Sequence, residues 1–303
     1  MRIGVDLGGT KIEIIALDSE GKVAARQRSA TPRHDYWGTL RTIAHLVRTI
    51  ETEIGEKGTV GVGTPGSLSP YTGRIRNANS VWLNGQCLDR DLADLLERPV
   101  RQANDADCFA LSEAVDGAGR DARCVFGVII GTGTGGGVVV QGRLLAGPNG
   151  IAGEWGHNPL PWPKQEELPG PPCYCGKRGC IETFLSGPGL AGDFAHSTGR
   201  ELTPPAIVAA ADAGDSDAAA VLRRYEDRMA RALASVINIL DPNVIVLGGG
   251  LSNLEALYVD IPRLIQPYLF SDGVALDLRR PIHGDSSGVR GAAWLWPASG
   301  ASS

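Results

Sequence analysis

The stretch Ile3-Gly4-Val5-Asp6-Leu7-Gly8-Gly9-Thr10-Lys11 decides the fold, and a second apolar run, residues 12–17, follows it directly. Two apolar runs around a glycine turn predict a β-hairpin. Glycine lets backbone N–H groups approach an anion closely, and Thr10 adds a hydroxyl donor. Asp6 is placed to hold the water shell of Mg²⁺. The pattern therefore indicates a phosphate site, although Gly-Gly alone favours a plain tight turn.

The same pattern returns about halfway along the chain, in residues 126–140. An apolar run leads into Gly131-Thr132-Gly133-Thr134-Gly135-Gly136-Gly137, and three valines follow. Two copies of one phosphate-type hairpin predict two similar lobes that face a cleft. A dinucleotide-binding fold would need a helix after the glycines, and the valines argue against one.

Polar residues, Asn104-Asp105-Ala106-Asp107, follow a predicted strand at residues 100–103. In an α/β sheet, ligands bind at the carboxyl ends of strands. Asn and Asp are also favoured at helix N-caps, and residues 106–115 are predicted to be helical. Both roles can hold at once.

Apolar spacing and turn residues predict the remaining elements. The predicted helices are residues 36–54, 88–96, 207–213, 218–240, 291–296 and 254–269, the last with interruptions at Pro262 and Pro267. The predicted strands are 244–247 and a strand in 60–66 that runs into a turn. The turn-rich segment 67–85 is either a substrate loop or an ordinary surface loop. Gly248-Gly249-Gly250 permits a ring such as adenine to lie against bare backbone. The tail, 298–303, is expected to be frayed.

Three cysteines and a histidine are concentrated in one part of the chain. Cys173, Cys175 and Cys180, with His157, form a complete tetrahedral set for Zn²⁺, so the predicted metal is structural and a catalytic zinc hydroxide is disfavoured. A trio of free thiols is the alternative. The scattered Cys87, Cys108 and Cys124 are predicted to be buried structural thiols, and His34, His45, His196 and His283 to be surface or core residues.

The bulk composition excludes several classes of protein. The chain has 303 residues, 43% of them hydrophobic and 21% charged, and a formal net charge of −5. These are ordinary globular values, and without a dense basic run a nucleic-acid partner is not expected. No run is long enough for a membrane helix, and the N-terminus lacks the pattern of a secretory signal. A cytoplasmic location is therefore predicted.

Taken together, these motifs resemble the ROK family of repressors and sugar kinases. The resemblance is carried by residues 6–11 and 131–137, by Gly153-Glu154-Trp155-Gly156-His157, and by the segment from Cys173 to Glu182. It implies an α/β protein with the actin-like (RNase H-like) ATPase fold, in which two lobes with a duplicated strand-rich core enclose a cleft. It implies lobes of residues 1–118, completed by a C-terminal helix in 289–303, and 119–288 with the zinc loop. It also implies a homodimer.

The resemblance implies a role for each site residue. Asp105 would be the general base, and the sugar would be bound by Gly66, Asn79, Asn104, Asp105, Glu154, His157 and Glu182. ATP and Mg²⁺ would be bound by Asp6, Gly8, Gly9, Thr10, Lys11, Thr132, Gly133, Thr134, Gly135, Gly248 and Gly249. One ring nitrogen of His157 would bind zinc and the other would face the sugar.

The predicted function is ATP-dependent phosphorylation of a hexose at its 6-hydroxyl. Residues 77–85, 157–162 and 284–291 resemble the bacterial fructokinases of the family, which also accept mannose, so D-fructose is the expected substrate. The alternatives are a glucokinase, an N-acetylhexosamine kinase and a non-catalytic sugar-sensing regulator. Repressors of the family carry a helix-turn-helix segment ahead of the first motif, which here begins at Asp6, so an enzyme is expected.

Overall fold

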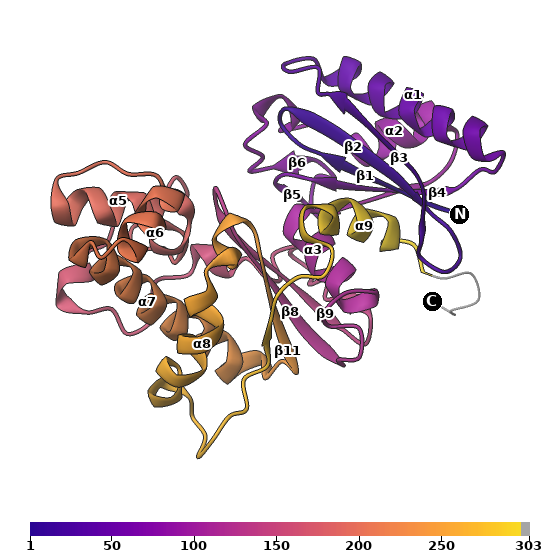
Figure 1. Cartoon of the computed structure of the whole chain (residues 1–303). Helices are drawn as coiled ribbons and strands as arrows, with labels where there is room; N and C mark the ends of the chain where they lie inside the picture. The colour runs from indigo at the N-terminus through magenta and orange to yellow at the C-terminus, as the bar shows by residue number, and fades with distance from the viewer. Residues whose placement is uncertain (298–303) are drawn as a thin grey trace. The chain divides into compact units, whose positions relative to one another are not determined.

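The computed structural model describes residues 1–297 and divides into two compact units (Figure 1). The first comprises Met1–Asp121, Gly137–Ala152 and the chain from Ile282, and the second comprises Ala122–Gly136 and Gly153–Pro281. These bounds differ from the predicted lobes because residues 119–121, 137–152 and 282–288 group with the first unit. The predicted frayed tail, 298–303, lies outside the described residues.

A five-stranded sheet of order β3-β2-β1-β4-β7 forms the centre of the first unit. Its strands are β1 (Arg2–Leu7), β2 (Lys11–Leu17), β3 (Val23–Ala30), β4 (Thr59–Thr64) and β7 (Val100–Asn104). β1 pairs antiparallel with β2 and parallel with β4, which is in turn parallel to β7. The hairpin predicted around Gly8 and Gly9 is confirmed, with Leu7 opposite Ile12.

Helices cover both faces of this sheet. They are α1 (Tyr36–Ile54), α2 (Leu88–Leu96), α3 (Asp105–Val115) and α9 (Ser287–Trp294). Because side chains alternate along a strand, Ile3 and Val5 join the core formed with α1. On the neighbouring β2, Ile15 packs against Val289 of α9. The predicted helices at 36–54 and 88–96 are confirmed, whereas the closing helix begins at Ser287 rather than at residue 291.

Helix α9 lies directly on the backbone of its neighbours. An ideal Cβ on Gly61 of β4 would lie 1.9 Å from the carbonyl oxygen of Ala292. A Cβ on Gly291 would lie 1.6 Å from the carbonyl oxygen of Cys108 in α3. Separations this short are overlaps, so α9 can sit against the sheet and α3 only because these positions lack side chains.

The turn-rich segment that follows β4 is not a plain loop. It contains a small antiparallel hairpin, β5 (Ser67–Leu68) and β6 (Ile75–Arg76), and then a 3₁₀ turn at Val81–Leu83. Asn84 fixes the turn, since its side-chain oxygen accepts from the Ala78 N–H at 2.9 Å and its amide donates to the Ala78 carbonyl at 2.9 Å.

The second sheet has the order β10-β9-β8-β11-β12. Its strands are β8 (Cys124–Ile130), β9 (Thr134–Val140), β10 (Arg143–Leu144), β11 (Val244–Gly248) and β12 (Leu278–Arg279). β8 and β9 are neighbours, which confirms the second predicted strand–turn–strand unit. β11 runs parallel to β8 and β12.

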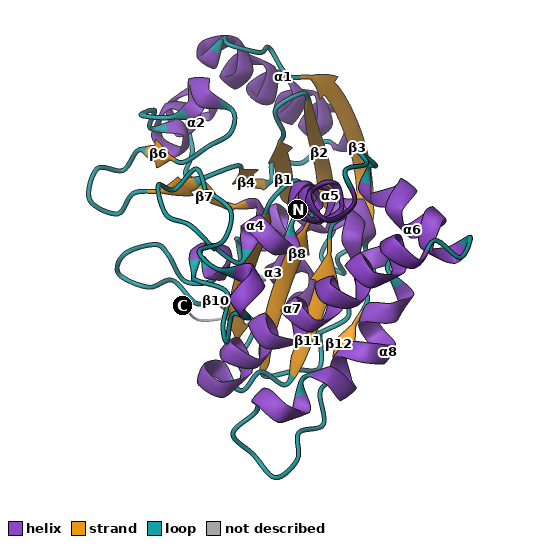
Figure 2. Ribbon diagram, turned by 90° about the vertical axis from the view of Figure 1, so that its left-hand side faces the viewer, coloured by secondary structure: helices purple, strands orange, loops and turns teal. Residues whose placement is uncertain are grey.

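Figure 2 shows helices of the second unit beside strands β8, β11 and β12. They are α4 (Glu182–Leu185), α5 (Gly187–Thr198), α6 (Pro204–Asp212), α7 (Ser216–Leu240) and α8 (Glu255–Leu264). The helical segment predicted for 254–269, with interruptions at Pro262 and Pro267, is confirmed in part: α8 continues through Pro262 and ends at Leu264, and a 3₁₀ turn, Gln266–Tyr268, follows. Pro267 has no N–H with which to continue the α-helical ladder. None of the described helices is long and apolar enough to span a membrane.

Changing Gly291 to Ala tests the backbone contact of α9. Overpacking at this position is expected to destabilise the protein by about 3 kcal/mol or more. Gly192→Ala is the matched control, because Gly192 lies within α5 and an added Cβ there meets nothing within 4 Å. The control should be neutral or gain up to about 1 kcal/mol. Urea unfolding of the two variants measures both effects, and equal midpoints would contradict the argument.

Candidate active site

The carboxyl ends of three parallel strands bring the polar residues of the first unit together. Asp6 lies near the end of β1, opposite Gly63 of β4, and Thr64 of β4 lies opposite Asn104, which ends β7. Asp105 follows as the first residue of α3. Parallel strands that end at one edge place these groups where α/β proteins bind ligands.

Asn104 fixes the backbone around Asp105. Its side-chain oxygen caps α3 by accepting from the Ala106 N–H at 2.8 Å, and its amide donates to the Gly66 carbonyl at 2.8 Å. The predicted N-cap is therefore confirmed, and one amide hydrogen and one lone pair of Asn104 are not used by these two bonds. The exposed Asp105 also accepts from the Ala106 N–H, at 2.8 Å. The positive end of the α3 dipole favours its carboxylate form.

Asp6 is held in an unfavourable environment for a charge. Burial, together with the nearby carboxylates of Asp105 and Glu13, raises the pKa of Asp6 to about 6 against the opposing effect of Lys11. Gly288 lies beside this carboxyl group, because a Cβ there would lie 3.9 Å from the Asp6 carboxyl carbon. A carboxylate close to other carboxylates suits a hydrated Mg²⁺.

The first glycine turn is tightly closed. The Gly8 N–H donates to the Lys11 carbonyl at 2.9 Å, and the Thr31 hydroxyl donates to the Gly8 carbonyl at 2.8 Å. An ideal Cβ on Gly9 would lie 3.1 Å from the Ser80 hydroxyl oxygen. The neighbouring Thr10 is exposed. The turn is thus preformed by its own backbone bonds.

Lys11 lies in an ion pair that the sequence did not reveal. Its ammonium group is 3.0 Å from the carboxylate of Glu13, which is only 1% exposed and is also paired with Arg26 and Arg28. Although burial acts in the opposite direction, hydrogen bonds from these cations lower the pKa of Glu13 to about 2. The one signal available was an acidic residue inside the apolar run 12–17.

Two other predicted sugar contacts lie beside the small hairpin of the first unit. Gly66 has a φ of 75°, and a Cβ there would lie 2.4 Å from the Arg76 carbonyl oxygen, so the position requires glycine. Asn79 is exposed on the turn that Asn84 fixes.

In the second unit, Glu182 is bonded to the second glycine turn. Its carboxylate accepts from the Thr134 N–H at 3.0 Å, and a Cβ on Gly133 would lie 2.8 Å from the same oxygen. The indole of Trp155, next to Glu154, donates to the Gly135 carbonyl at 2.9 Å. The predicted sugar and phosphate residues of this unit are therefore physically connected.

The glycines after β11 have a packing role. Gly249 has a φ of 84°, and a Cβ there would lie 2.5 Å from the carbonyl oxygen of Ile130, at the end of β8. Gly248 ends the fully buried strand β11. The exit of β11 thus lies next to the turn that contains Thr132, and a role for these glycines in binding adenine stays a prediction.

The ligand atoms of His157, Cys173, Cys175 and Cys180 all lie within 4.8 Å of one another. Cys173 Sγ is 3.6 Å from His157 Nδ1, and Cys175 Sγ is 3.6 Å from Cys180 Sγ. Tetrahedral zinc with Zn–S bonds of about 2.3 Å requires sulfur atoms about 3.8 Å apart. The four residues therefore fit zinc.

The second ring nitrogen of His157, expected to face the sugar, lies 2.9 Å from the hydroxyl of Tyr174, a residue that the sequence reasoning passed over, and the sugar contact of His157 stays a prediction. The burial predicted for the scattered thiols needs correction. Of the three scattered thiols predicted to be buried, only Cys108 is; Cys87 and Cys124 are partly exposed, because nothing covers these strand and helix ends completely.

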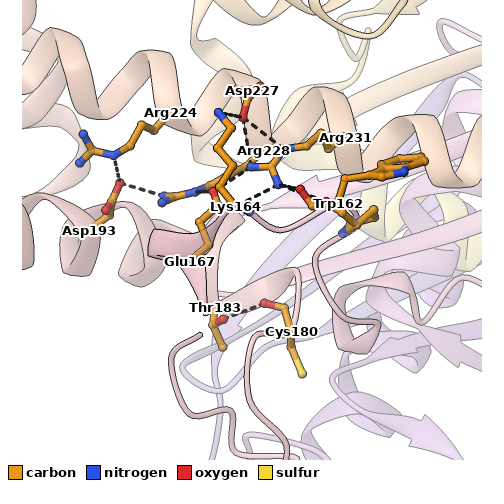
Figure 3. Close-up of polar contacts among 11 residues, drawn as sticks. Trp162, Lys164, Glu167, Cys180, Thr183, Asp193, Arg224, Asp227, Arg228 and Arg231 are labelled. Carbon is orange, nitrogen blue, oxygen red and sulfur yellow. Dashed lines mark hydrogen bonds and ion pairs between the residues drawn. The ribbon is translucent and has the colours of Figure 1, made fainter. Parts of the chain in front are cut away.

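A buried ion network anchors the Pro-rich segment, residues 159–172, to α7 (Figure 3). Glu167 accepts from Arg231 at 2.7 and 2.9 Å and from Arg228 at 2.8 Å, and these hydrogen bonds lower the pKa of Glu167 to about 2 despite burial. Arg231 also donates to the carbonyls of Pro161 and Trp162, at 3.1 and 2.8 Å. These hydrogen bonds and ion pairs fix the position of the segment without any metal.

Comparison with known proteins finds a family and relatives that match nearly the whole chain. A model of the ROK family matches residues 2–299. The chain belongs to the ROK family. It is 40% identical over 299 residues to the N-acetyl-D-glucosamine kinase of Yersinia pseudotuberculosis, covering 97% of this chain and 98% of that protein. The Vibrio cholerae N-acetyl-D-glucosamine kinase shows the same identity, with 97% and 99% covered.

Solved structures agree in fold. The ROK hexokinase of Thermus thermophilus superposes with a TM-score of 0.86 at 32% identity, covering 97% of this chain and 96% of that one. A ROK family glucokinase of Streptomyces griseus, solved with glucose and AMPPNP, gives 0.76 at 28% identity, with 97% and 98% covered. The chain is thus a ROK sugar kinase with the predicted actin-like ATPase fold.

The predicted preference for fructose is not supported by these relatives. Their names favour the N-acetylhexosamine alternative over fructokinase. Short loop motifs misled the sequence argument, because one hydroxyl or methyl group in a pocket is worth only about 1–3 kcal/mol and depends on geometry.

The raised pKa of Asp6 predicts a pH-dependent effect of Asp6→Asn. The folded protein releases this proton at about pH 6 and the unfolded chain near pH 4, so the carboxylate lowers stability as pH rises through that interval. In magnesium-free buffer the variant should gain up to about 3 kcal/mol at pH 8 and almost nothing at pH 4. Urea unfolding at both values measures this, with the exposed Asp121→Asn as control. A gain that is equal at the two values would contradict the assignment.

Proposed function

We propose that this ROK sugar kinase transfers the γ-phosphoryl group of ATP to the 6-hydroxyl of a hexose, with N-acetyl-D-glucosamine as the first acceptor to test. The supporting observation is the edge of the first sheet, where the exposed Asp105 starts α3 close to the half-buried Asp6. The choice of acceptor follows from the relatives.

Asp105 is the proposed general base. Its carboxylate is held by the Ala106 N–H, is favoured as an anion by the helix dipole, and remains exposed to a substrate. It would take the proton of the 6-hydroxyl as that oxygen attacks phosphorus, a contribution typically worth ~10² to 10⁴ in rate.

The remaining rate enhancement is assigned to positioning and charge. Mg²⁺ held near Asp6 would neutralise charge on the phosphates. The backbone N–H groups of the turns at Gly8–Gly9–Thr10 and Thr132–Gly135 would orient phosphate oxygens, with Lys11 nearby. An in-line arrangement of two bound reactants supplies the rest.

Several directed polar groups are needed to hold a polyol. In the first unit the proposed contacts are Gly66, Asn79 and Asn104, and in the second they are Glu154, His157 and Glu182. Glu182 would use its second oxygen, since the first accepts from Thr134. Mannose and fructose are also tested, because residues 77–85 resemble the fructokinases of the family.

A coupled ADP-release assay over a hexose panel tests the function. With Mg²⁺ and ATP, N-acetyl-D-glucosamine should give the highest kcat/KM, and NMR should place the phosphate on O6. Asp105→Asn should lower kcat by at least ~10² with the fold intact, because an amide cannot accept the proton. Asp121→Asn, an exposed carboxylate of the same unit, is the control.

A higher kcat/KM for fructose or mannose would overturn the choice of acceptor, but it would still support the proposed kinase activity. Turnover retained by Asp105→Asn would remove that residue as the base. Hexose binding without any phosphotransfer would favour a sugar-sensing regulator.

We also propose that His157, Cys173, Cys175 and Cys180 bind one structural Zn²⁺, since their spacing fits it. Four protein ligands leave no position for a reactive water, so the metal would order the loop and orient His157. A homodimer and a cytoplasmic location stay predictions.

Elemental analysis of the purified protein should find about one zinc per chain. Cys175→Ser should lose the metal and show both a lower melting temperature and a weaker hexose Kd, because loop order and sugar contacts are coupled. Cys87→Ser should retain zinc, since Cys87 lies outside the cluster. A metal-free protein with unchanged hexose Kd would contradict the coupling.

A further inference from the structure

Glu13 is a buried carboxylate in β2, the strand that leaves the first glycine turn. It is 1% exposed and interrupts the apolar run 12–17. Its neighbours Ile12 and Ile14 point to the opposite face of the sheet, into the core formed with α1. Burying a charge destabilises a protein unless partners compensate for the lost water, so Glu13 depends on the cations around it.

Two arginines fix the orientation of the Glu13 carboxylate. Arg28 lies opposite Glu13 on β3 and contacts both carboxylate oxygens, at 3.0 and 3.1 Å. Arg26 donates to Glu13 at 2.6 Å and to the hydroxyl of Ser286, directly before α9, at 2.7 Å. A two-pronged contact between a guanidinium and a carboxylate leaves little freedom to rotate. The carboxylate is therefore a fixed partner for a third cation.

The third cation is Lys11, the residue at which the glycine turn ends. Its ammonium nitrogen lies 3.0 Å from Glu13 Oε2, and its side chain is 49% exposed. Lys11 and Glu13 are two residues apart on one strand, so their side chains lie on the same face of the sheet. Asp6 lies opposite Glu13 on β1 and shares that face. The ammonium is thus held next to the turn, on the side where Asp6 lies.

The charges of this group do not cancel. Lys11, Arg26 and Arg28 share a single carboxylate, so the group keeps a positive charge. A lysine ammonium has three N–H donors, and the contact with Glu13 Oε2 uses one of them. Lys11 can therefore donate to a phosphate oxygen while it remains bound to Glu13.

The contact with Glu13 also removes freedom from the lysine side chain. A long side chain that must be ordered when a ligand binds weakens that binding by a factor of about 2 to 10. Lys11 is ordered before any ligand arrives, because Glu13 holds its ammonium. The turn itself is closed by the backbone bond from the Gly8 N–H to the Lys11 carbonyl, so the ion pair acts on the side chain rather than on the turn.

We propose that Glu13 is a positioning residue for phosphoryl transfer: it holds the ammonium of Lys11 ready for the terminal phosphate of ATP and does not itself touch a substrate. This inference rests on the proposed kinase function. It gives the buried charge in β2 a role in the reaction, through Lys11, in addition to its contacts with the two arginines.

Glu13→Gln keeps the shape of the side chain and removes its charge. The variant should lower kcat/KM for ATP about 5- to 10-fold, because Lys11 must then be ordered as ATP binds, while the hexose Kd stays within about 2-fold. Steady-state kinetics and calorimetry with the hexose alone measure the two quantities. Glu20→Gln is the matched control, because Glu20 pairs with Lys22 at 2.7 Å, also two residues away, and both side chains are exposed.

A double-mutant cycle with Lys11→Met separates positioning of the lysine from support of the hairpin. If Glu13 acts through Lys11, Glu13→Gln should have no further effect on kcat/KM for ATP in the Lys11→Met background. The same factor in both backgrounds would show that Glu13 only supports the fold, and would overturn the proposal. An unchanged kcat/KM for ATP in the single variant Glu13→Gln would overturn it as well.

Loss of a buried charge that lies among cations can also prevent folding. If Glu13→Gln does not fold, Glu13→Asp replaces it in the cycle: aspartate keeps the charge for the arginines but is one methylene too short to hold Lys11 in the same place, and the same outcomes decide. If the wild-type protein phosphorylates no hexose, the proposed function fails. The Kd of a non-hydrolysable ATP analogue, measured through the same cycle, then decides the role of Glu13.

Discussion

The first unit depends on one close contact, the seating of α9 on bare backbone. Gly61 and Gly291 leave no side chain between this helix, strand β4 and helix α3. The same contact brings Gly288, at the start of α9, next to the Asp6 carboxyl group. Residues far apart in the sequence, Asp6 and Gly288, are thus brought together by that packing.

The pKa values of acidic side chains in this protein are shifted in two opposite directions. Glu13 and Glu167 are buried but surrounded by cations, which lower the pKa of each to about 2 and make them structural anchors. Asp6 is half-buried near Asp105 with too little compensating charge, and its pKa rises to about 6. The carboxylates of Glu13 and Glu167, with lowered pKa values, therefore hold the hairpin and the Pro-rich segment. Asp6, whose pKa is raised, lies where a cation and phosphates are proposed to bind.

Much of the architecture followed from local pattern, because glycine turns between apolar runs leave few alternatives to a hairpin. The two turns at Gly8 and Gly133, the helix at 36–54 and the cap at Asn104 are in this group. The bond from Glu182 to Thr134, the pairing of Lys11 with Glu13 and the anchoring of Glu167 by Arg231 were not visible. Each of these contacts joins two residues whose spacing in the sequence follows no helix or strand period.

The sequence by itself determined the family, the fold class and the cluster of His157 with three cysteines, since these rest on short motifs whose residue types and spacing carry the chemistry. Only the tertiary structure decided what those residues face. It placed the hydroxyl of Tyr174 on the free nitrogen of His157 and assigned residues 137–152 to the first unit. Side-chain direction and long-range packing depend on the sum of many weak contacts, and no single stretch of sequence contains that sum.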